Sequence, residues 1–363
     1  MKRRTVLKCS AIVLTVMAAL ATACGDDSGS SAATTGSASS QPTTITLLTH
    51  DAFAVSKGVL EGFTEQTGIT VKVLQAGDAG AMVNQAILTK GKPLGDVLYG
   101  VDNTFLTRAV DAGIFEPYSS PGLSDVDDQF ADQTANGAVT PIDFGDVCLN
   151  YDKAYFAEHD LPPPTSLESL TKPEYKDLTV VENPATSSPG LAFVLGTVDH
   201  FGEEGWLGYW KQLEANGVEV ASSWDEAYYT DFSGSSGKGP KPIVVSYASS
   251  PPAEVIFAET PLTEAPTAVV ESTCFRQVEF AGVLAGTKHA EAAQQFIDFM
   301  VGTTFQNDMP LNMFVYPVNT KAVLPDEFVK YSVVPDKPLS LPPDEIAKNR
   351  DQWINEWTST VLG

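Results

Sequence analysis

Residues 44–101 read TITLLTHDAFAVSKGVLEGFTEQTGITVKVLQAGDAGAMVNQAILTKGKPLGDVLYGV, and the alternation within this stretch decides the expected fold. Three short runs of β-branched and apolar residues each predict a strand: 44–49, 69–74 and 96–101. Between them, apolar residues at helical spacing before a glycine predict two helices: 53–67 and 79–90. Strands and helices that alternate in this way form right-handed crossovers. We therefore expect an α/β fold with mainly parallel sheets flanked by helices.

The same alternation continues toward the C-terminus. Helices are predicted at 103–112, 289–301 and 344–361. Strands are predicted at 147–150, 179–181, 242–246 and 276–284. A loop rich in Gly, Ser and Pro is expected at 233–241.

Length and composition restrict the class of protein. The chain has 363 residues, of which 43% are hydrophobic and 19% charged, so it can bury a large core and is too apolar for a disordered protein. Its 46 acidic and 22 basic residues give a formal net charge of −24. Because nucleic acids are bound through clustered Lys and Arg, this acidity argues against a nucleic-acid partner. It is compatible with a cationic ligand.

The N-terminus predicts an export signal. Residues 1–8 hold four basic residues and no acidic one, and an apolar run follows at 11–21. This order is typical of a secretory signal peptide, here 1–23, because the run is too short to span a membrane as a helix. The small residues before Cys24 resemble a bacterial lipobox and predict lipidation of Cys24. The alternative is an ordinary signal in which Cys24 is incidental.

The segment after the signal predicts a link to the membrane. Residues 24–43 consist mainly of small and polar residues, which is typical of a flexible tether. The pair Arg3-Arg4 resembles a twin-arginine signal, so both the Sec and the twin-arginine export routes stay open. We expect a protein anchored by lipid to the outer face of the cell membrane.

Two cysteines remain once the signal and Cys24 are set aside. An exported protein meets an oxidising compartment, in which an even pair of cysteines is typically bonded. We therefore predict a single disulfide between Cys148 and Cys274.

Polar residues follow three predicted strands. They are His50-Asp51, Asp102-Asn103 and Ser246-Tyr247. In open parallel sheets, ligands bind at the carboxyl ends of the strands, so these pairs predict a shared pocket. The alternative for each pair alone is helix capping, at which Asp and Asn are common.

Two segments place Ser and Pro at the start of a predicted helix: 186–190 and 249–251. Such a helix start presents backbone N–H groups and the positive end of the dipole, which can bind a phosphate or carboxylate. Simple capping is again the alternative.

Aromatic residues are the third indication of a binding site. Trp224, Tyr228 and Tyr229 lie beside Asp225 and Glu226 in the sequence. Aromatic faces next to carboxylates suit a flat organic cation, through stacking and cation–π attraction. Core packing is the alternative role for these rings.

Seven segments resemble bacterial thiamine-binding proteins, and they occur in the order of that family. They are THDAF (49–53), GVDNTFL (100–106), PIDFGDVCLNYDK (141–153), TSSPGL (186–191), SWDEAYY (223–229), VSYASSP (245–251) and FQNDMPLNMFVYPV (305–318). Those proteins are the substrate-binding components of thiamine ABC importers and have the fold of type II periplasmic binding proteins. The resemblance covers nearly the whole chain after residue 43.

The resemblance implies two lobes joined by hinge crossover strands that close on a ligand. Lobe 1 would hold 44–145 and 277–363, and lobe 2 would hold 146–276. The protein would be a non-catalytic monomer without cofactor or metal, and it would deliver thiamine or a thiamine phosphate to an ABC permease.

The resemblance also implies roles for single residues. Asp51, Asp102 and Asn103 would contact the pyrimidine side of the ligand. Trp224, Tyr228 and Tyr247 would line the ring pocket. The hydroxyethyl or phosphate end would face Ser187, Ser188, Gly190 and Ser250. Tyr316 would lie nearby.

The chain departs from the family at three places. Phe314 stands where the family usually has Trp, and His50 replaces a position often held by Tyr. The loop 233–241 is longer and richer in glycine. These departures leave the preferred form of the vitamin (thiamine, monophosphate or diphosphate) open.

Other functions remain as alternatives. Tyr228 and Tyr229 with His50 could hold ferric iron, and another organic cation such as a polyamine could fill the pocket. A thiaminase-like enzyme would use Cys148 as nucleophile with Asp143 or Asp146 as base, although the acidic surroundings oppose a thiolate. The four histidines are scattered, without metal-site spacing.

Overall fold

A computed structural model describes residues 43–363, and the first strand begins at Thr43. The predicted signal peptide 1–23, the lipidation site Cys24 and the predicted tether up to residue 42 lie outside the described residues. No helix within 43–363 has both the length and the apolar character needed to cross a membrane.

Ten strands of the described chain form one sheet, in the order β2-β1-β3-β9-β5-β8-β6-β7, with β10 paired to β5 and β4 to β9. The strands are β1 (Thr43–Thr49), β2 (Ile69–Gln75), β3 (Val97–Asp102), β4 (Phe115–Glu116), β5 (Thr140–Asp152), β6 (Thr179–Glu182), β7 (Glu219–Ala221), β8 (Ile243–Tyr247), β9 (Thr267–Leu284) and β10 (Tyr316–Pro317).

The two ends of the sheet are parallel and its middle is antiparallel. Strand β1 pairs in parallel with β2 and β3, and β6 pairs in parallel with β7 and β8. In the middle, β9 is antiparallel to β3 and β5, and β5 is antiparallel to β8. The prediction of parallel strands therefore holds at both ends of the sheet. The two long strands between these ends, β5 and β9, pair with their neighbours in antiparallel orientation.

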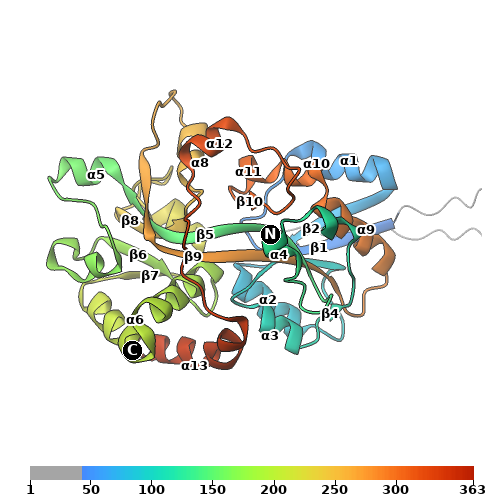
Figure 1. Cartoon of the computed structure of the whole chain (residues 1–363), viewed down its shortest axis with the longest axis horizontal. Helices are drawn as coiled ribbons and strands as arrows, with labels where there is room; N and C mark the ends of the chain where they lie inside the picture. Colours follow the sequence, from blue (N-terminus) through green and yellow to red (C-terminus); the bar gives the residue numbers. More distant parts are fainter. Residues whose placement is uncertain (1–42) are drawn as a thin grey trace, which may run out of the picture. The chain divides into compact units, whose positions relative to one another are not determined.

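Those two strands are much longer than the sequence pattern predicts. Strand β5 has 13 residues and β9 has 18, and both run across the middle of the described chain (Figure 1). Their polar residues Asp143, Asp146 and Gln277 are buried, so they interrupt the apolar pattern without ending the strand.

The helices cover the sheet and carry most of the remaining chain. They are α1 (Lys57–Thr67), α2 (Ala79–Leu88), α3 (Leu106–Asp111), α4 (Asp128–Ala131), α5 (Lys153–Glu158), α6 (Ser188–Ala215), α7 (Trp224–Glu226), α8 (Pro251–Ile256), α9 (Ala290–Val301), α10 (Thr303–Gln306), α11 (Met309–Asn312), α12 (Asp326–Tyr331) and α13 (Pro343–Val361). Short 3-10 helices lie at Pro121–Asp125, Leu167–Thr171 and Pro173–Tyr175, and a π-helical turn lies at Ala227–Asp231.

Two predicted helices begin later than expected. Helix α3 begins at Leu106 rather than at residue 103, and helix α1 begins at Lys57 rather than at residue 53; residues 52–54 line a cavity described below. Helix α6 is the longest of the described chain, with 28 residues, and is broken at Gly202 by a positive φ of 70°. The sequence indicated only its start.

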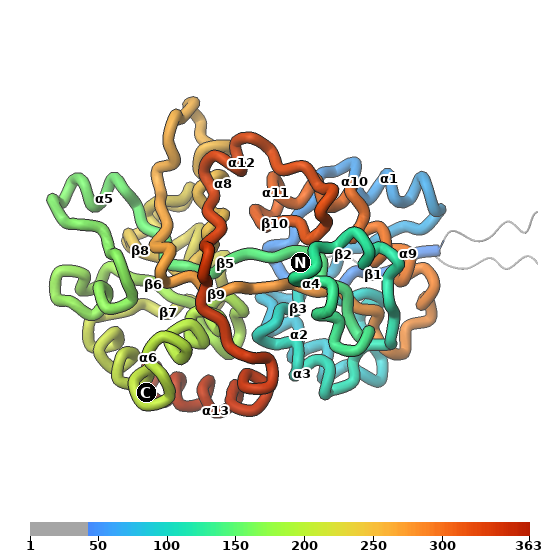
Figure 2. Tube along the Cα trace, viewed as in Figure 1, coloured from blue at the N-terminus to red at the C-terminus, as the bar shows by residue number. Residues whose placement is uncertain are grey.

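The C-terminal segment crosses the long strands. Between α12 and α13 the chain passes over β5 and β9 (Figure 2), and the Leu339 N–H donates to the Cys274 carbonyl at 2.7 Å. Helix α13 then packs on α6, where the Trp357 and Trp210 rings lie 5.4 Å apart. An ion pair of 3.6 Å between Arg108 and Asp351 also ties α13 to α3.

Candidate functional site

A cavity of about 290 Å³ lies where several strands end and the next helices begin. Its walls come from the segment after β1, the starts of α2, α6 and α7, the end of β8, helix α8, strand β9 and the loop at 312–315. This is the position that the rule for open α/β sheets predicts for a ligand.

One wall is aromatic. Trp224 stacks on Tyr228 with ring centroids 5.0 Å apart and planes at 16°, while Tyr229 and Tyr247 meet its edges. The indole Nε1 of Trp224 donates to Ser246 Oγ at 3.0 Å. The ring is therefore held by one face and by its nitrogen.

Tyr228 supports this wall from behind. It is only 2% exposed, and its hydroxyl donates to Glu254 Oε1 at 2.9 Å. Burial, together with the Glu254 charge, raises the pKa of Tyr228 well above its ordinary value. The phenol is thus held as a neutral donor.

Phenylalanines line the cavity away from Trp224. Phe314 and Phe257 meet edge to face, with ring centroids 5.7 Å apart. Phe314 has a φ of 54°, which is uncommon for a bulky residue, and its carbonyl accepts the Ser249 hydroxyl at 2.5 Å. Strained backbone of this kind is concentrated at functional sites.

Four carboxylates line the cavity: Asp51, Asp78, Asp225 and Glu279. His50 is the only basic residue among the lining residues. Burial raises the pKa of Asp225, and the neighbouring charges of Asp51 and Asp78 raise it further. The cavity is therefore a site of negative potential.

His50 and Glu279 form a buried ion pair in the cavity wall. His50 Nε2 lies 3.5 Å from Glu279 Oε1. Burial alone would lower the pKa of His50 and raise that of Glu279, but the mutual attraction reverses both, so His50 is raised and Glu279 lowered. The two opposite charges therefore stabilise each other in the cavity wall.

A second layer of polar residues lies beneath the cavity. The Tyr99 hydroxyl donates to Asp143 Oδ2 at 2.6 Å and lies 3.4 Å from Glu279 Oε2. Burial, together with the Glu279 charge, raises the pKa of Asp143 well above its ordinary value. Asp143 therefore belongs to a buried network and is not a free base.

Asp102, for which the resemblance implies a ligand contact, belongs to this second layer and is not among the residues that line the cavity. It is fully buried and accepts from Gln277 Nε2 at 2.5 Å and from Thr104 Oγ1 at 2.8 Å. Gln277 in turn accepts the Tyr247 hydroxyl at 2.6 Å and donates to Ser188 Oγ at 3.0 Å. Asp102 thus reaches two lining residues only through Gln277.

Asn103 also lies outside the lining. Its side chain donates to the Arg276 carbonyl at 3.1 Å and accepts from the Val278 N–H at 3.1 Å. These bonds join the end of β3 to β9, so Asn103 has a structural role here.

The helix-start residues divide into two groups. Ser188 and Ser250 line the cavity, whereas Ser187 and Gly190 do not. The Ser187 hydroxyl caps α6 by accepting from the Gly190 N–H at 3.4 Å. A Cβ on Gly190 would lie 2.6 Å from the Glu182 carbonyl oxygen, so this glycine allows α6 to begin close to β6.

Tyr316 lies on β10 and also does not line the cavity. Its ring stacks on Phe144 at 5.2 Å and meets Phe328 at 4.9 Å. It packs between β5 and α12.

Asp78 and Glu279 line the cavity but are not among the site residues predicted from the sequence. Asp78 follows β2 in the same way that Asp51 follows β1, so the rule of polar strand ends could have selected it. Glu279 lies in the middle of the apolar strand β9, where no local pattern distinguishes it.

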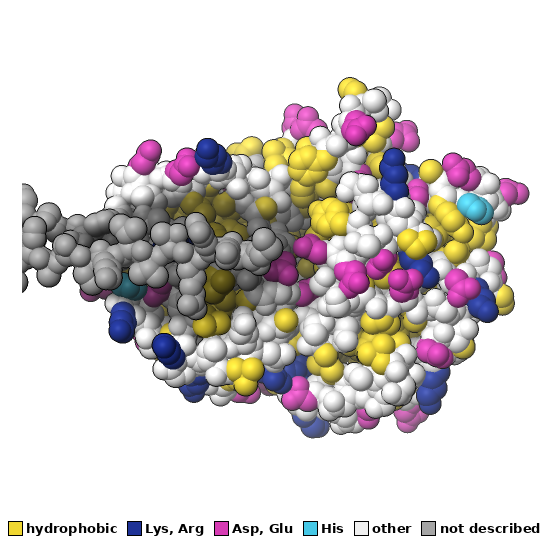
Figure 3. Space-filling view, turned by 180° about the vertical axis from the view of Figure 1, so that it is seen from behind, with side chains coloured by type: hydrophobic (Ala, Val, Ile, Leu, Met, Phe, Trp, Pro, Cys, Tyr) yellow, Lys and Arg dark blue, Asp and Glu magenta, His cyan; other side chains and the backbone are white. Residues whose placement is uncertain are grey.

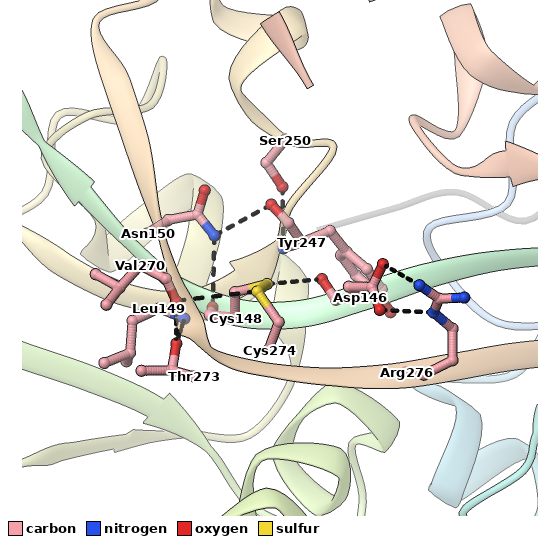
Figure 4. Close-up of a disulfide and its surroundings, with 10 residues drawn as sticks. All are labelled: Asp146, Cys148, Leu149, Asn150, Tyr247, Ser250, Val270, Thr273, Cys274 and Arg276. Atoms are coloured by element: carbon pink, nitrogen blue, oxygen red, sulfur yellow. Dashed lines mark hydrogen bonds and ion pairs between the residues drawn. A yellow bond between two sulfur atoms is a disulfide. The ribbon is translucent and has the colours of Figure 1, made fainter. Parts of the chain in front are cut away.

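A disulfide joins the two long strands beside this site. Cys148 on β5 and Cys274 on β9 are bonded, with Cα atoms 4.1 Å apart (Figure 4). Nearby, Asp146 forms a buried ion pair with Arg276 at 2.6 Å. The thiaminase-like alternative requires Cys148 as a free thiolate and Asp146 as a base, and this arrangement offers neither.

On the face shown in Figure 3, acidic and basic side chains lie among one another, whereas the cavity lining holds four carboxylates and no Lys or Arg. No group of three or more His, Cys, Asp or Glu within residues 43–363 has the arrangement of a metal site.

Comparisons with known proteins identify the relatives of this chain. The thiamine-binding periplasmic protein of Brucella suis is 29% identical over 324 residues, which cover 88% of this chain and 92% of that protein. The Fe(3+)-binding periplasmic protein of Serratia marcescens is 24% identical and covers 83% of this chain and 85% of its own. A solved periplasmic thiamin binding protein is 28% identical with a TM-score of 0.78, covering 88% of this chain and 96% of that one.

These similarities confirm the predicted type II periplasmic-binding-protein fold and the predicted resemblance to thiamine-binding proteins. Residues 92–349 match the family described as bacterial extracellular solute-binding protein. Since this match covers most of the chain, the protein belongs to the family of bacterial extracellular solute-binding proteins.

Proposed function

We propose that the protein captures thiamine in the cavity between Trp224 and the Phe314 loop. The observation that carries this proposal is the stacked Trp224–Tyr228 wall in a cavity lined by four carboxylates and by no Lys or Arg. A flat, positively charged ring gains stacking, cation–π and Coulomb attraction in such a site.

The size of the cavity and the comparisons support the same ligand. A volume of about 290 Å³ is at the lower end of the range for ligand sites and suits a small molecule. The Brucella relative and the solved neighbour are both named for thiamine.

Capture would proceed by closure of two lobes. In this proposal, lobe 1 holds residues 44–145 and 277–363, and lobe 2 holds residues 146–276. The long strands β5 and β9 connect the two parallel ends of the sheet and would serve as the hinge crossovers. A ligand that touches both lobes shifts the balance toward the closed form.

We further propose that the protein is exported, anchored through Cys24 and delivers its ligand to an ABC permease as a monomer. The basic and apolar N-terminal residues support export, and the small residues before Cys24 support the anchor. Mass spectrometry of the mature N-terminus tests both, since a diacylated cysteine at residue 24 is expected. If Cys24 holds the lipid anchor, a Cys24→Ser variant should be found outside the membrane fraction, whereas the wild type should be found in it.

Calorimetric titration of the purified chain tests the ligand. Thiamine should bind with a stoichiometry of one, while spermidine should bind at least tenfold more weakly, because it has no ring for the aromatic wall. Absence of a thiamine signal would refute the proposal, and tighter binding of spermidine would replace thiamine by a polyamine.

Ferric iron is the second candidate because of the Serratia relative. Iron would require Tyr228 and Tyr229 as phenolates. The Tyr228 hydroxyl instead donates to Glu254, and burial raises the pKa of both tyrosines. A visible tyrosinate charge-transfer band on addition of ferric citrate would favour iron, and its absence together with thiamine binding favours the vitamin.

A further inference from the structure

Residues at both ends of helix α8 contact Phe314. Before the helix, the Ser249 hydroxyl donates to the Phe314 carbonyl at 2.5 Å. After the helix, the Phe257 ring meets the Phe314 ring edge to face, with centroids 5.7 Å apart and planes at 70°. One short helix therefore supports both the backbone and the ring of a residue that lines the cavity.

The backbone of Phe314 depends on such support. Its φ of 54° lies in the left-handed region, which a bulky residue adopts only where the surrounding structure holds it there. The Phe314 N–H donates to the Met309 carbonyl at 3.2 Å, at the start of α11. Together with the bond from Ser249, this fixes the peptide groups on either side of the strained residue.

Ser249 acts on the cavity through Phe314. It is fully buried and is not among the residues that line the cavity. Capping and anion binding are the roles predicted for the segment 249–251, but the Ser249 hydroxyl instead bonds to a residue 65 positions away. Removal of this hydroxyl leaves the Phe314 carbonyl without this donor and the strained backbone without one of its supports.

The same helix is tied to the aromatic wall on the other side of the cavity. Glu254, within α8, accepts the Tyr228 hydroxyl at 2.9 Å, and Tyr228 stacks on Trp224. Helix α8 therefore holds the Trp224 wall and the Phe314 ring relative to each other. A flat ligand binds more tightly when both surfaces are already in place, because less conformational freedom is lost on binding.

We propose that Ser249 and Phe257 are positioning residues, which fix the Phe314 ring at the place where it meets the ligand. This inference rests on the proposed function and adds to it the residues that prepare one wall of the site. Both side chains are uncharged, so their effect on affinity comes through the order of the Phe314 loop and leaves the negative potential of the cavity unchanged.

Calorimetric titration of the purified full chain with thiamine tests the inference. Ser249→Ala should weaken binding by about fivefold, because the Phe314 loop becomes less ordered. Ser249→Thr keeps a hydroxyl and should bind within about twofold of the wild type. Phe257→Ala should weaken binding by about threefold through loss of the aromatic pair. Since Phe257 is 70% exposed, this variant should fold as the wild type does.

A double-mutant cycle with Phe314→Ala separates positioning from any other effect. In the Phe314→Ala background no ring remains to be positioned, so Ser249→Ala should weaken binding further by less than about twofold. Equal losses in the two backgrounds would show that Ser249 does not act through Phe314, and would overturn the inference. If a thermal melt shows that Ser249→Ala does not fold, the same cycle with Phe257→Ala decides.

Ser332→Ala is the matched control. The Ser332 hydroxyl donates to the Phe328 carbonyl at 2.5 Å, which is a bond of the same kind, but neither residue lines the cavity. Thiamine binding should change by less than about twofold in this variant. A loss as large as that in Ser249→Ala would point to a general effect of stability and would refute the positioning role.

Two outcomes separate this inference from the proposed function. If the wild type binds thiamine and a folded Ser249→Ala variant binds it equally well, the inference fails and the proposed function stands. If the wild type does not bind thiamine, the proposed function itself fails and the inference falls with it.

Discussion

Trp224 shows how single residues prepare the site. Its ring rests on Tyr228, and its nitrogen is held by Ser246, so little side-chain entropy remains to be lost when a ligand stacks on it. Asp102, which the sequence singled out with equal reason, lies one layer deeper and acts on the cavity only through Gln277.

At this scale we expect Trp224→Ala to weaken thiamine binding by about tenfold or more. Loss of one aromatic partner of a cation corresponds to about 1–2 kcal/mol, and tenfold in affinity corresponds to about 1.4 kcal/mol. Trp224→Phe keeps a ring and should lose less. Calorimetric titration measures both, and an unchanged affinity in the alanine variant would contradict the assignment.

The raised pKa of the buried Asp102 carboxyl should make the stability of the protein depend on pH. Burial raises its pKa from 3.8 to about 7, despite the hydrogen bonds from Gln277 and Thr104. The folded protein therefore keeps a proton on Asp102 that the unfolded chain loses near pH 4. The free energy of unfolding should fall as pH rises from about 4 to about 7, by up to about 4 kcal/mol from this group.

Asp102→Asn tests this dependence, since asparagine resembles the protonated acid. The variant should be more stable than the wild type at pH 8, and the two should approach each other at pH 5. Urea unfolding at several pH values gives the comparison. A difference that does not change with pH would exclude Asp102 as the titrating group.

At the scale of elements, the start of α6 depends on a close approach to β6. The Cβ of any larger residue at Gly190 would meet the Glu182 carbonyl, which is backbone and cannot move freely. The same helix start presents Ser188 to the cavity and its N–H to Asp78. Packing of this element and the geometry of the site are thus linked.

We expect Gly190→Ala to destabilise the protein by about 1–3 kcal/mol and to weaken ligand binding, because the added methyl group overpacks this contact. Gly208→Ala is the matched control in the same helix, where a Cβ meets nothing within 4 Å. It should stabilise by about 0.5–1 kcal/mol, since alanine is the better helix former. Thermal unfolding and titration of the two variants check the contrast; similar losses in both would refute it.

At the scale of the whole described chain, β5 and β9 hold the parallel ends of the sheet together. They pair with each other over most of their length, and the disulfide links them as well. Cys148 and Cys274 are fully buried. The bond is therefore protected from a reductant in the folded state.

We expect the double change Cys148→Ser and Cys274→Ser to lower the free energy of unfolding by about 4 kcal/mol. The bonded residues are 126 positions apart, and a cross-link over a loop of this length restricts the unfolded chain strongly. Urea unfolding of the wild type with and without reductant measures the same effect. Two free thiols in the unfolded, unreduced protein would show that the bond is absent.

The elements between residues 43 and 113 could be predicted well from the sequence, because their periodicity is local. Strands β1, β2 and β3 lie within one residue of the predicted ranges, and α9 and α13 match their predictions similarly closely. The lengths of β5 and β9 could not be predicted from the sequence. Polar residues such as Asp143 and Asp146 are typical of strand ends, and only the structure shows that they are buried within a strand. There they are bonded to Tyr99 and Arg276, which are distant in the sequence.

By itself the sequence determined the fold class, the family and the kind of side chains in the site, since apolar periodicity and ordered motifs are local properties of the chain. The strand-end rule selected Asp51, which does line the cavity, but only the tertiary structure decided that Glu279 faces the cavity and Asp102 does not. The register between β3 and β9 shifts between Tyr99 and Val101, at Gly100 with a φ of 99°. Such a bulge redirects the side chains after it, so whether Asp102 faces a ligand depends on the pairing of strands far apart in the sequence. The same long-range packing brings Asp78 to the starts of α6 and α7, and no local pattern could show that.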